Sequence, residues 1–226
     1  MLFVQQILTV AAKDLRSEFR TKEALNASLS FALVILLLFS FAFDPTADTT
    51  REISGGLLWL VFAFAGALIL NRSFARELVN DCMDMLLASP VPGPALFLGK
   101  VLANYILLLG IELCCLPVFG LFYRATWWEQ PLWLAAVFLL ATWGISVVGT
   151  VFSALTVNLR LRELMLPMLV YPMLIPCLMA AMRLTTPILA GDPMTGDVLA
   201  WMRLLLAFDI IFTSLSVMLV ETILIG

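Results

Sequence analysis

The sequence has no histidine and few charged residues, and both features narrow the kinds of protein it can encode. Without histidine the chain lacks the commonest metal and haem ligand and the usual general base. Only 13% of its 226 residues are charged, whereas 62% are hydrophobic. Ordinary soluble domains are roughly 45–50% apolar and roughly 25% charged. We therefore expect the bilayer to be the solvent of this chain and its fold to be that of an all-α, polytopic membrane protein.

Several chemical signatures are also missing. The net charge of −3 gives no indication of a nucleic-acid partner. No Ser/His, Cys/His or metal-ligand group and no pair of catalytic carboxylates has a usable spacing, so we expect no enzyme, catalytic residue, metal or directly bound cofactor. The cysteines have no C-x-x-C spacing and lie mostly in apolar runs, so we interpret them as small buried hydrophobic residues: Cys82, Cys114, Cys115 and Cys177.

Long apolar stretches predict six transmembrane helices in a single domain covering residues 1–226. The predicted spans are residues 24–43, 54–70, 95–119, 132–157, 164–182 and 199–225, and a polar loop is predicted at 183–198. An amphipathic helix is predicted before the first span, lying on the membrane surface. Its apolar residues recur at helical spacing: Leu8, Ala11, Ala12, Leu15 and Phe19. Charged residues fill its other side: Lys13, Asp14, Arg16, Glu18, Arg20, Lys22 and Glu23.

Lysine and arginine are distributed unequally between the two sets of loops, which indicates the orientation of the chain. Nine lie on one side and four lie on or near the other. Because basic residues favour cytoplasmic loops, we expect both termini, residues 71–94 and the 158–163 link to be cytoplasmic. The nine are Lys13, Arg16, Arg20, Lys22, Arg72, Arg76, Lys100, Arg160 and Arg162, and the four are Arg51, Arg124, Arg183 and Arg203.

The longest polar stretch, residues 71–94, is called the coupling segment below. It contains a short amphipathic pattern, which predicts a helix on the cytoplasmic side between spans two and three. Such a helix is either a surface connector or a docking site for a cytoplasmic motor, and its position between two spans favours docking. The charged residues that would contact an ATPase are Arg72, Arg76, Glu77, Asp81 and Asp84.

A phosphate-binding loop is excluded near the start of span three. Gly93, Gly99 and Lys100 superficially resemble G-x-x-x-x-G-K-[S/T], but five residues separate the glycines and Val101 replaces the required hydroxyl residue. We therefore expect the chain to bind no nucleotide and any ATP to be hydrolysed by a partner subunit.

Ionisable residues within the predicted spans are the next candidates for function. Glu112 and Asp209 require hydration or hydrogen-bonding partners in hydrocarbon, and a polar path and a structural hydrogen bond explain them equally well. Glu221 is better explained as an interfacial residue near the end of span six.

Two further patterns concern helix shape and packing. Prolines remove backbone hydrogen-bond donors, so span five is expected to be kinked or broken at Pro167, Pro172 and Pro176, a shape that serves either packing or gating. Ser146, Thr150 and Ala154 recur every four residues on span four and offer a close-packing face for another span, a second copy or a partner.

Two stretches resemble the CcmB family of haem exporter proteins, within the ABC-2-type permeases. The first runs from Arg76-Glu77-Leu78 through Asp84-Met85-Leu86-Leu87-Ala88-Ser89-Pro90 to Gly99-Lys100 and is similar to the family's coupling segment. The second, Leu166-Pro167 to Pro176, is similar to its proline-marked fifth helix. The length, the six spans and the N-terminal amphipathic helix agree over essentially the whole chain.

The resemblance implies a permease in the bacterial inner membrane, acting in c-type cytochrome biogenesis. It implies a complex with a cytoplasmic ABC ATPase that binds the ATP, a haem-handling membrane subunit, a small accessory membrane protein and a membrane-anchored haem chaperone. Two copies of the permease are implied, and the complex handles haem. The alternatives are an ABC-2-type permease for a lipid, glycan or drug, and an ATP-independent membrane scaffold.

Overall fold

The computed structural model describes residues 2–44, 47–75, 77, 91–123, 125–157, 159, 161–192 and 197–225. These residues form seven α-helices and no strand. Six of the helices are long and apolar enough to cross a membrane, which confirms the predicted all-α class and six spans. The helices are α1 (Leu2–Thr21), α2 (Glu23–Ala42), α3 (Asp48–Leu70), α6 (Gly93–Tyr123), α7 (Pro131–Thr156), α8 (Arg162–Ala190) and α9 (Val198–Ile225).

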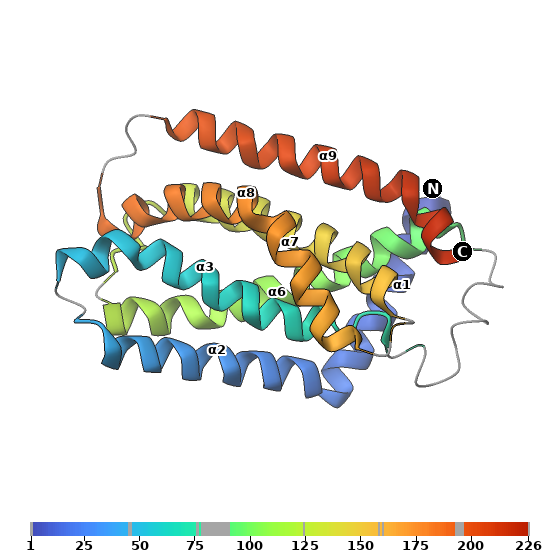
Figure 1. Cartoon of the computed structure of the whole chain (residues 1–226), viewed down its shortest axis with the longest axis horizontal. Helices are drawn as coiled ribbons and strands as arrows, with labels where there is room; N and C mark the ends of the chain where they lie inside the picture. Colours follow the sequence, from blue (N-terminus) through green and yellow to red (C-terminus); the bar gives the residue numbers. More distant parts are fainter. Residues whose placement is uncertain are drawn as a thin grey trace.

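The six long helices form one bundle, with α1 crossing one end of it (Figure 1). Both chain termini lie at that end, as an even number of spans requires. α7 packs against α6, α8 and α9, and α3 packs against α2, α6 and α8. An aromatic cluster joins α3 to α7, where Trp59, Phe62 and Phe138 meet edge to face with ring centroids 5.5–5.7 Å apart.

The prediction of a polar loop at 183–198 is wrong for its first eight residues, because α8 continues to Ala190. Thr185 is fully buried and accepts a hydrogen bond of 2.9 Å from the indole nitrogen of Trp59 on α3. Ile188 and Leu189 are buried as well, so this last part of α8 contributes to the core despite the polar residues before it. Gly191 then ends the helix in the left-handed conformation, with φ of 73°.

α1 buries only part of its predicted apolar face against the bundle, and contact of the rest of that face with the membrane surface stays a prediction. Ala11 is buried, but Leu8 and Phe19 are more than half exposed, and Glu18, which was expected on the polar face, is buried. The carboxylate of Glu18 accepts a hydrogen bond of 2.9 Å from the backbone N–H of Leu25, in the first turn of α2. Because the first N–H groups of a helix lack partners within it, this contact fixes the corner between α1 and α2.

Candidate functional site: a buried ion cluster beside the coupling segment

Lys100, on the second turn of α6, is fully buried. Its Nζ donates to Glu77 Oε1 at 2.7 Å, to Asp14 Oδ2 at 3.1 Å and to the backbone oxygen of Ser73 at 2.8 Å. The same Nζ lies 4.7 Å from the centre of the Phe74 ring. An ammonium group has three donors, so every donor of this buried cation has an acceptor. The contacts join α6 to α1 and to the coupling segment.

A second lysine lies on the rim of the same group. Lys13 Nζ is 3.1 Å from Asp14 Oδ1 and 3.1 Å from Glu77 Oε1, and half of its side chain is exposed. Burial alone would lower the pKa of Lys13, but its attraction to Asp14 and Glu77 outweighs burial and raises the pKa above its ordinary value of 10.5. Lys13, Asp14, Glu77 and Lys100 are called the ion cluster below, and their formal charges sum to zero.

Close helix packing brings the cluster together. α1 crosses α6 at Gly99, where an added Cβ would lie 2.6 Å from the Cβ of Val10. This approach places Asp14, one turn after Val10, next to Lys100. From the other side, the chain turns after α3, and Phe74 packs in a buried group with Ala154 and Val157 at the end of α7. That packing holds Ser73 and Glu77 over the first turns of α6.

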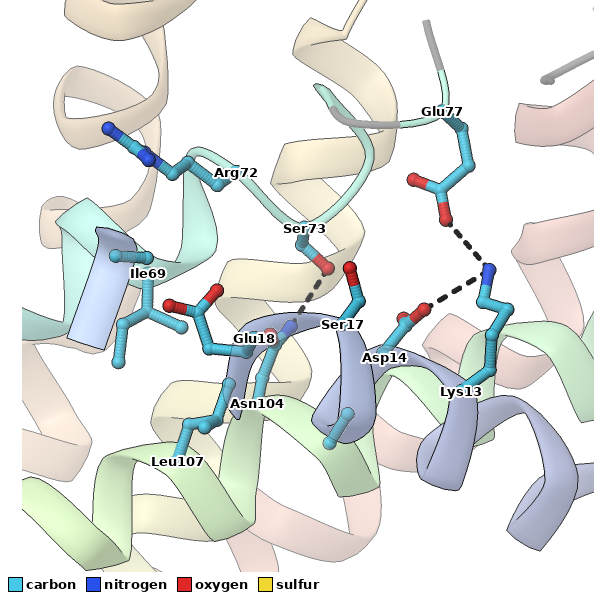
Figure 2. Close-up of a pocket in the computed structure, with 12 residues that line it drawn as sticks. Lys13, Asp14, Ser17, Glu18, Ile69, Arg72, Ser73, Glu77, Asn104 and Leu107 are labelled. Carbon is cyan, nitrogen blue, oxygen red and sulfur yellow. Dashed lines mark hydrogen bonds and ion pairs between the residues drawn. The ribbon is translucent and has the colours of Figure 1, made fainter. Parts of the chain in front are cut away.

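A cavity of about 200 Å³ lies beside the cluster, between α1, the end of α3 and α6. Figure 2 shows Lys13 reaching from α1 toward both Asp14 and Glu77 on one side of it. Across the cavity, the Asn104 amide donates to Ser73 Oγ at 2.9 Å. Arg72 pairs with Glu23 at 2.8 Å, but both side chains are exposed, so this pair contributes about 0–1 kcal/mol to stability.

The two intramembrane carboxyl groups are both buried, in different surroundings. Glu112 is 1% exposed, and both of its carboxyl oxygens lie 2.7 Å from the hydroxyl of Thr142 on α7. Asp209 on α9 is 6% exposed, and neither carboxyl oxygen has a hydrogen-bond partner among the described residues. Its Oδ1 lies 2.8 Å from where a Cβ on Gly144 would be, so a larger residue at this point of α7 would require the Asp209 side chain to move.

The structure places only some of the predicted site residues. Arg72 and Glu77 lie at the base of the coupling segment, whereas Arg76, Asp81 and Asp84, with the predicted coupling helix, are outside the described residues. α8 is one continuous helix with Pro167, Pro172 and Pro176 inside it, and its ribbon bends along its length in Figure 1. A role of these three prolines in bending or gating stays a prediction.

Sequence reasoning missed the ion cluster as a unit. Lys100 was considered as a topological charge, in the excluded phosphate-binding loop and in the family resemblance, and Lys13 and Asp14 as part of the polar face of the N-terminal helix, but they were not connected to one another. A lysine seven residues into an apolar helix is a signal that could have been used, because such a charge requires acidic partners. The partners themselves lie 86 and 23 positions away in the sequence, and no local pattern indicates them.

Comparison with known proteins covers nearly the whole chain. A family model described as CcmB protein matches residues 5–222. Three relatives are named heme exporter protein B. The protein of Rhodobacter capsulatus is 34% identical over 170 residues, which are 74% of this chain and 76% of the relative. That of Paracoccus denitrificans is 34% identical over 186 residues, 81% and 84% of the two chains. That of Pseudomonas aeruginosa is 31% identical over 207 residues, 91% and 92% of the two chains. The similarity therefore extends from α1 to α9.

Proposed function

Because the chain belongs to the CcmB family, we propose that it is the permease subunit of an ABC transporter complex for haem export or delivery in c-type cytochrome biogenesis. The observation that carries the proposal is the family match over residues 5–222, together with relatives that are named heme exporter protein B. The six apolar helices supply the membrane domain that such a subunit needs.

The motor of this complex is a separate cytoplasmic ABC ATPase, present with two copies of the permease. The other partners are a haem-handling membrane subunit, a small accessory membrane protein and a membrane-anchored haem chaperone. ATP binds to the ATPase, and haem is handled by the complex. The location is the bacterial inner membrane, with both termini in the cytoplasm, and the excess of basic residues at the end where the termini lie supports this orientation.

The coupling segment is the contact for the ATPase, and the ion cluster transmits its movement. Glu77 and the backbone of Ser73 belong to this segment, and both hold Lys100 of α6. A displacement of the segment therefore either moves α6 or breaks contacts to a buried charge. Because breaking such contacts costs several kcal/mol, the movement passes to α6 and to α1, which is bound through Asp14.

The first test is the purification of the tagged chain from its native membrane in mild detergent. Co-purifying proteins are identified by mass spectrometry, and a haem absorption spectrum is recorded. An ABC ATPase together with haem-handling subunits is the expected result. An ATPase with unrelated transport partners would contradict the haem assignment. Absence of an ATPase, under conditions that preserve control ABC complexes, would contradict the permease assignment and favour a scaffold.

Charge reversal then tests the docking site. Asp81→Lys with Asp84→Lys should release the ATPase from the purified complex while leaving the permease in the membrane, because the reversal removes the carboxylates that the segment would present at the proposed contact. Glu52→Lys is the matched control, since Glu52 is exposed at the opposite end of the bundle. An unchanged ATPase content in the double variant would place the docking site elsewhere.

A further inference from the structure

A line of polar residues runs along the interface between α6 and α7. Glu112 contacts Thr142, and Asn104 donates to Thr150 Oγ1 at 2.9 Å. Both pairs fit one antiparallel register, in which residue 108 lies opposite residue 146. Lys100, a member of the ion cluster, continues the line on α6. Polar residues therefore recur at intervals of four along both helices, and Leu108 interrupts the line on α6.

These side chains are buried in an apolar bundle. Thr142, Ser146 and Thr150 are fully buried, and Asn104 is 5% exposed. Burying polar groups in hydrocarbon is unfavourable unless they are hydrogen-bonded. Three levels of the line satisfy this condition, because Glu112 has Thr142, Asn104 has Thr150 and Ser73, and Lys100 has its three acceptors. At the fourth level, opposite Leu108, the hydroxyl of Ser146 has no hydrogen-bond partner among the residues that the structure describes.

The spacing at this level suits a water molecule. Four residues of an α-helix rise by about 6 Å, so the Ser146 hydroxyl is about 6 Å along the axis from those of Thr142 and Thr150. One water with two hydrogen bonds of about 2.8 Å spans such a gap. Buried water is typically found where a buried polar group lacks a protein partner. The line also reaches an entrance, because Asn104 and Ser73 line the cavity beside the ion cluster.

Glu112, at the other end of the line, faces no basic side chain of the described residues. The groups near its carboxyl are Thr142 on α7 and Tyr105 and Cys115 on α6, and Tyr105 also interacts with Asp209 on α9. No ion pair joins Glu112 to a basic side chain within the described part of the chain. A carboxyl group buried in hydrocarbon without a cation binds a proton rather than remaining charged.

We propose that Glu112 is a proton-binding site inside the membrane domain, reached from the ion-cluster end through water held at Ser146. In one exchange the Glu112 O–H bond breaks, its proton passes toward the cavity, and a proton from water replaces it. No electron moves, and the charge of Glu112 is the same before and after.

Infrared spectroscopy of the full chain in lipid nanodiscs tests this directly. A protonated carboxyl band should be present near neutral pH, be lost in Glu112→Gln and persist in Asp209→Asn. On transfer to D2O, the band assigned to Glu112 should shift faster than the band assigned to Asp209, which has no polar neighbour in hydrogen-bond range among the described residues. Both deuteration rates, that of Glu112 and that of Asp209, are measured in the wild-type chain.

Variants at position 146 then test the water. Ser146→Val removes the hydroxyl that would hold the water and should slow deuteration of Glu112 about tenfold, the effect of about 1.4 kcal/mol of barrier. Ser146→Ala removes the same hydroxyl without adding volume and should slow deuteration as well. Ser216→Val is the matched control, since Ser216 is a buried serine on α9.

Three results would overturn the proposal. The first is a spectrum in which Glu112→Gln removes no protonated band, because Glu112 would then be ionised. The second is deuteration of Glu112 no faster than that of Asp209. The third is a wild-type rate in Ser146→Val or in Ser146→Ala, since either would show that no water held by this hydroxyl carries the exchange.

Discussion

Replacing Lys100 by methionine removes the charge at the centre of the ion cluster while preserving most of the side-chain length. Removing one partner of a buried ion pair costs roughly 3–5 kcal/mol, because the remaining charge is left buried. Lys13 lowers this cost, since it contacts Asp14 and Glu77 at 3.1 Å and stays in place. We therefore expect Lys100→Met to lower the free energy of unfolding by about 3 kcal/mol.

Lys13→Met is the matched control, because it removes the same charge from the half-exposed rim. It should cost about 0–1 kcal/mol. The double variant leaves both carboxylates without an amine, so its loss should exceed the sum of the single losses by at least about 1 kcal/mol. Unfolding by sodium dodecyl sulfate in mixed micelles, followed by tryptophan fluorescence, measures all three. A loss of unfolding free energy below about 0.5 kcal/mol for Lys100→Met lies in the range of an ordinary surface substitution. It would refute the expectation that the buried charge of Lys100 stabilises the fold.

Two further predictions concern α1. Gly99→Ala places a Cβ 2.6 Å from Val10 Cβ and should lower stability by about 1–3 kcal/mol in the same assay. Adding Val10→Ala should recover part of the loss. Gly110→Ala is the control that should not be destabilised, because an added Cβ at Gly110 has no atom within 4 Å. The second prediction is a pH dependence. Because the pKa of Lys13 is raised on folding, its stabilisation is fully present below about pH 10.5 and is lost as pH rises through the folded-state pKa. The stability difference between wild type and Lys13→Met should therefore shrink at high pH, whereas the difference for Arg72→Met should not, since arginine stays charged there. A Lys13 difference that stays constant above pH 10.5 would contradict the assigned ion pairs.

The spans were predictable because their signal is local. A membrane helix is recognised in a sequence by about 20 consecutive apolar residues. The six predicted spans correspond to the six long helices. The errors occur where packing with distant residues decides the outcome. From the sequence, Thr185 is predicted to lie in a loop. In the structure it is buried, because Trp59, 126 positions earlier, provides a hydrogen bond.

The site was harder to predict, for the same reason. Glu112 could be identified from sequence because a lone carboxyl in an apolar run is conspicuous. Its position opposite Thr142 depends on the register between α6 and α7, which composition does not contain. The ion cluster depends further on α1 folding back over Gly99, so three separate segments must be placed before Lys100 acquires its partners.

The main effect of the ion cluster is to fix the positions of α1 and the coupling segment on α6, rather than to add stability to the fold. Replacing a buried ion pair by well-packed apolar residues is often neutral or stabilising, so burial of Lys100 alone does not explain its presence. Its three acceptors, however, come from α1 and the coupling segment, and they surround one Nζ only when both segments lie in a single arrangement on α6. Lys13 shares Oε1 of Glu77 with Lys100, while Oε2 is buried without a hydrogen-bond partner in the described part of the chain. A displacement of Glu77 relative to α6 would therefore loosen contacts to both amines at once, so the cluster favours movement of the coupling segment, α6 and α1 as one unit.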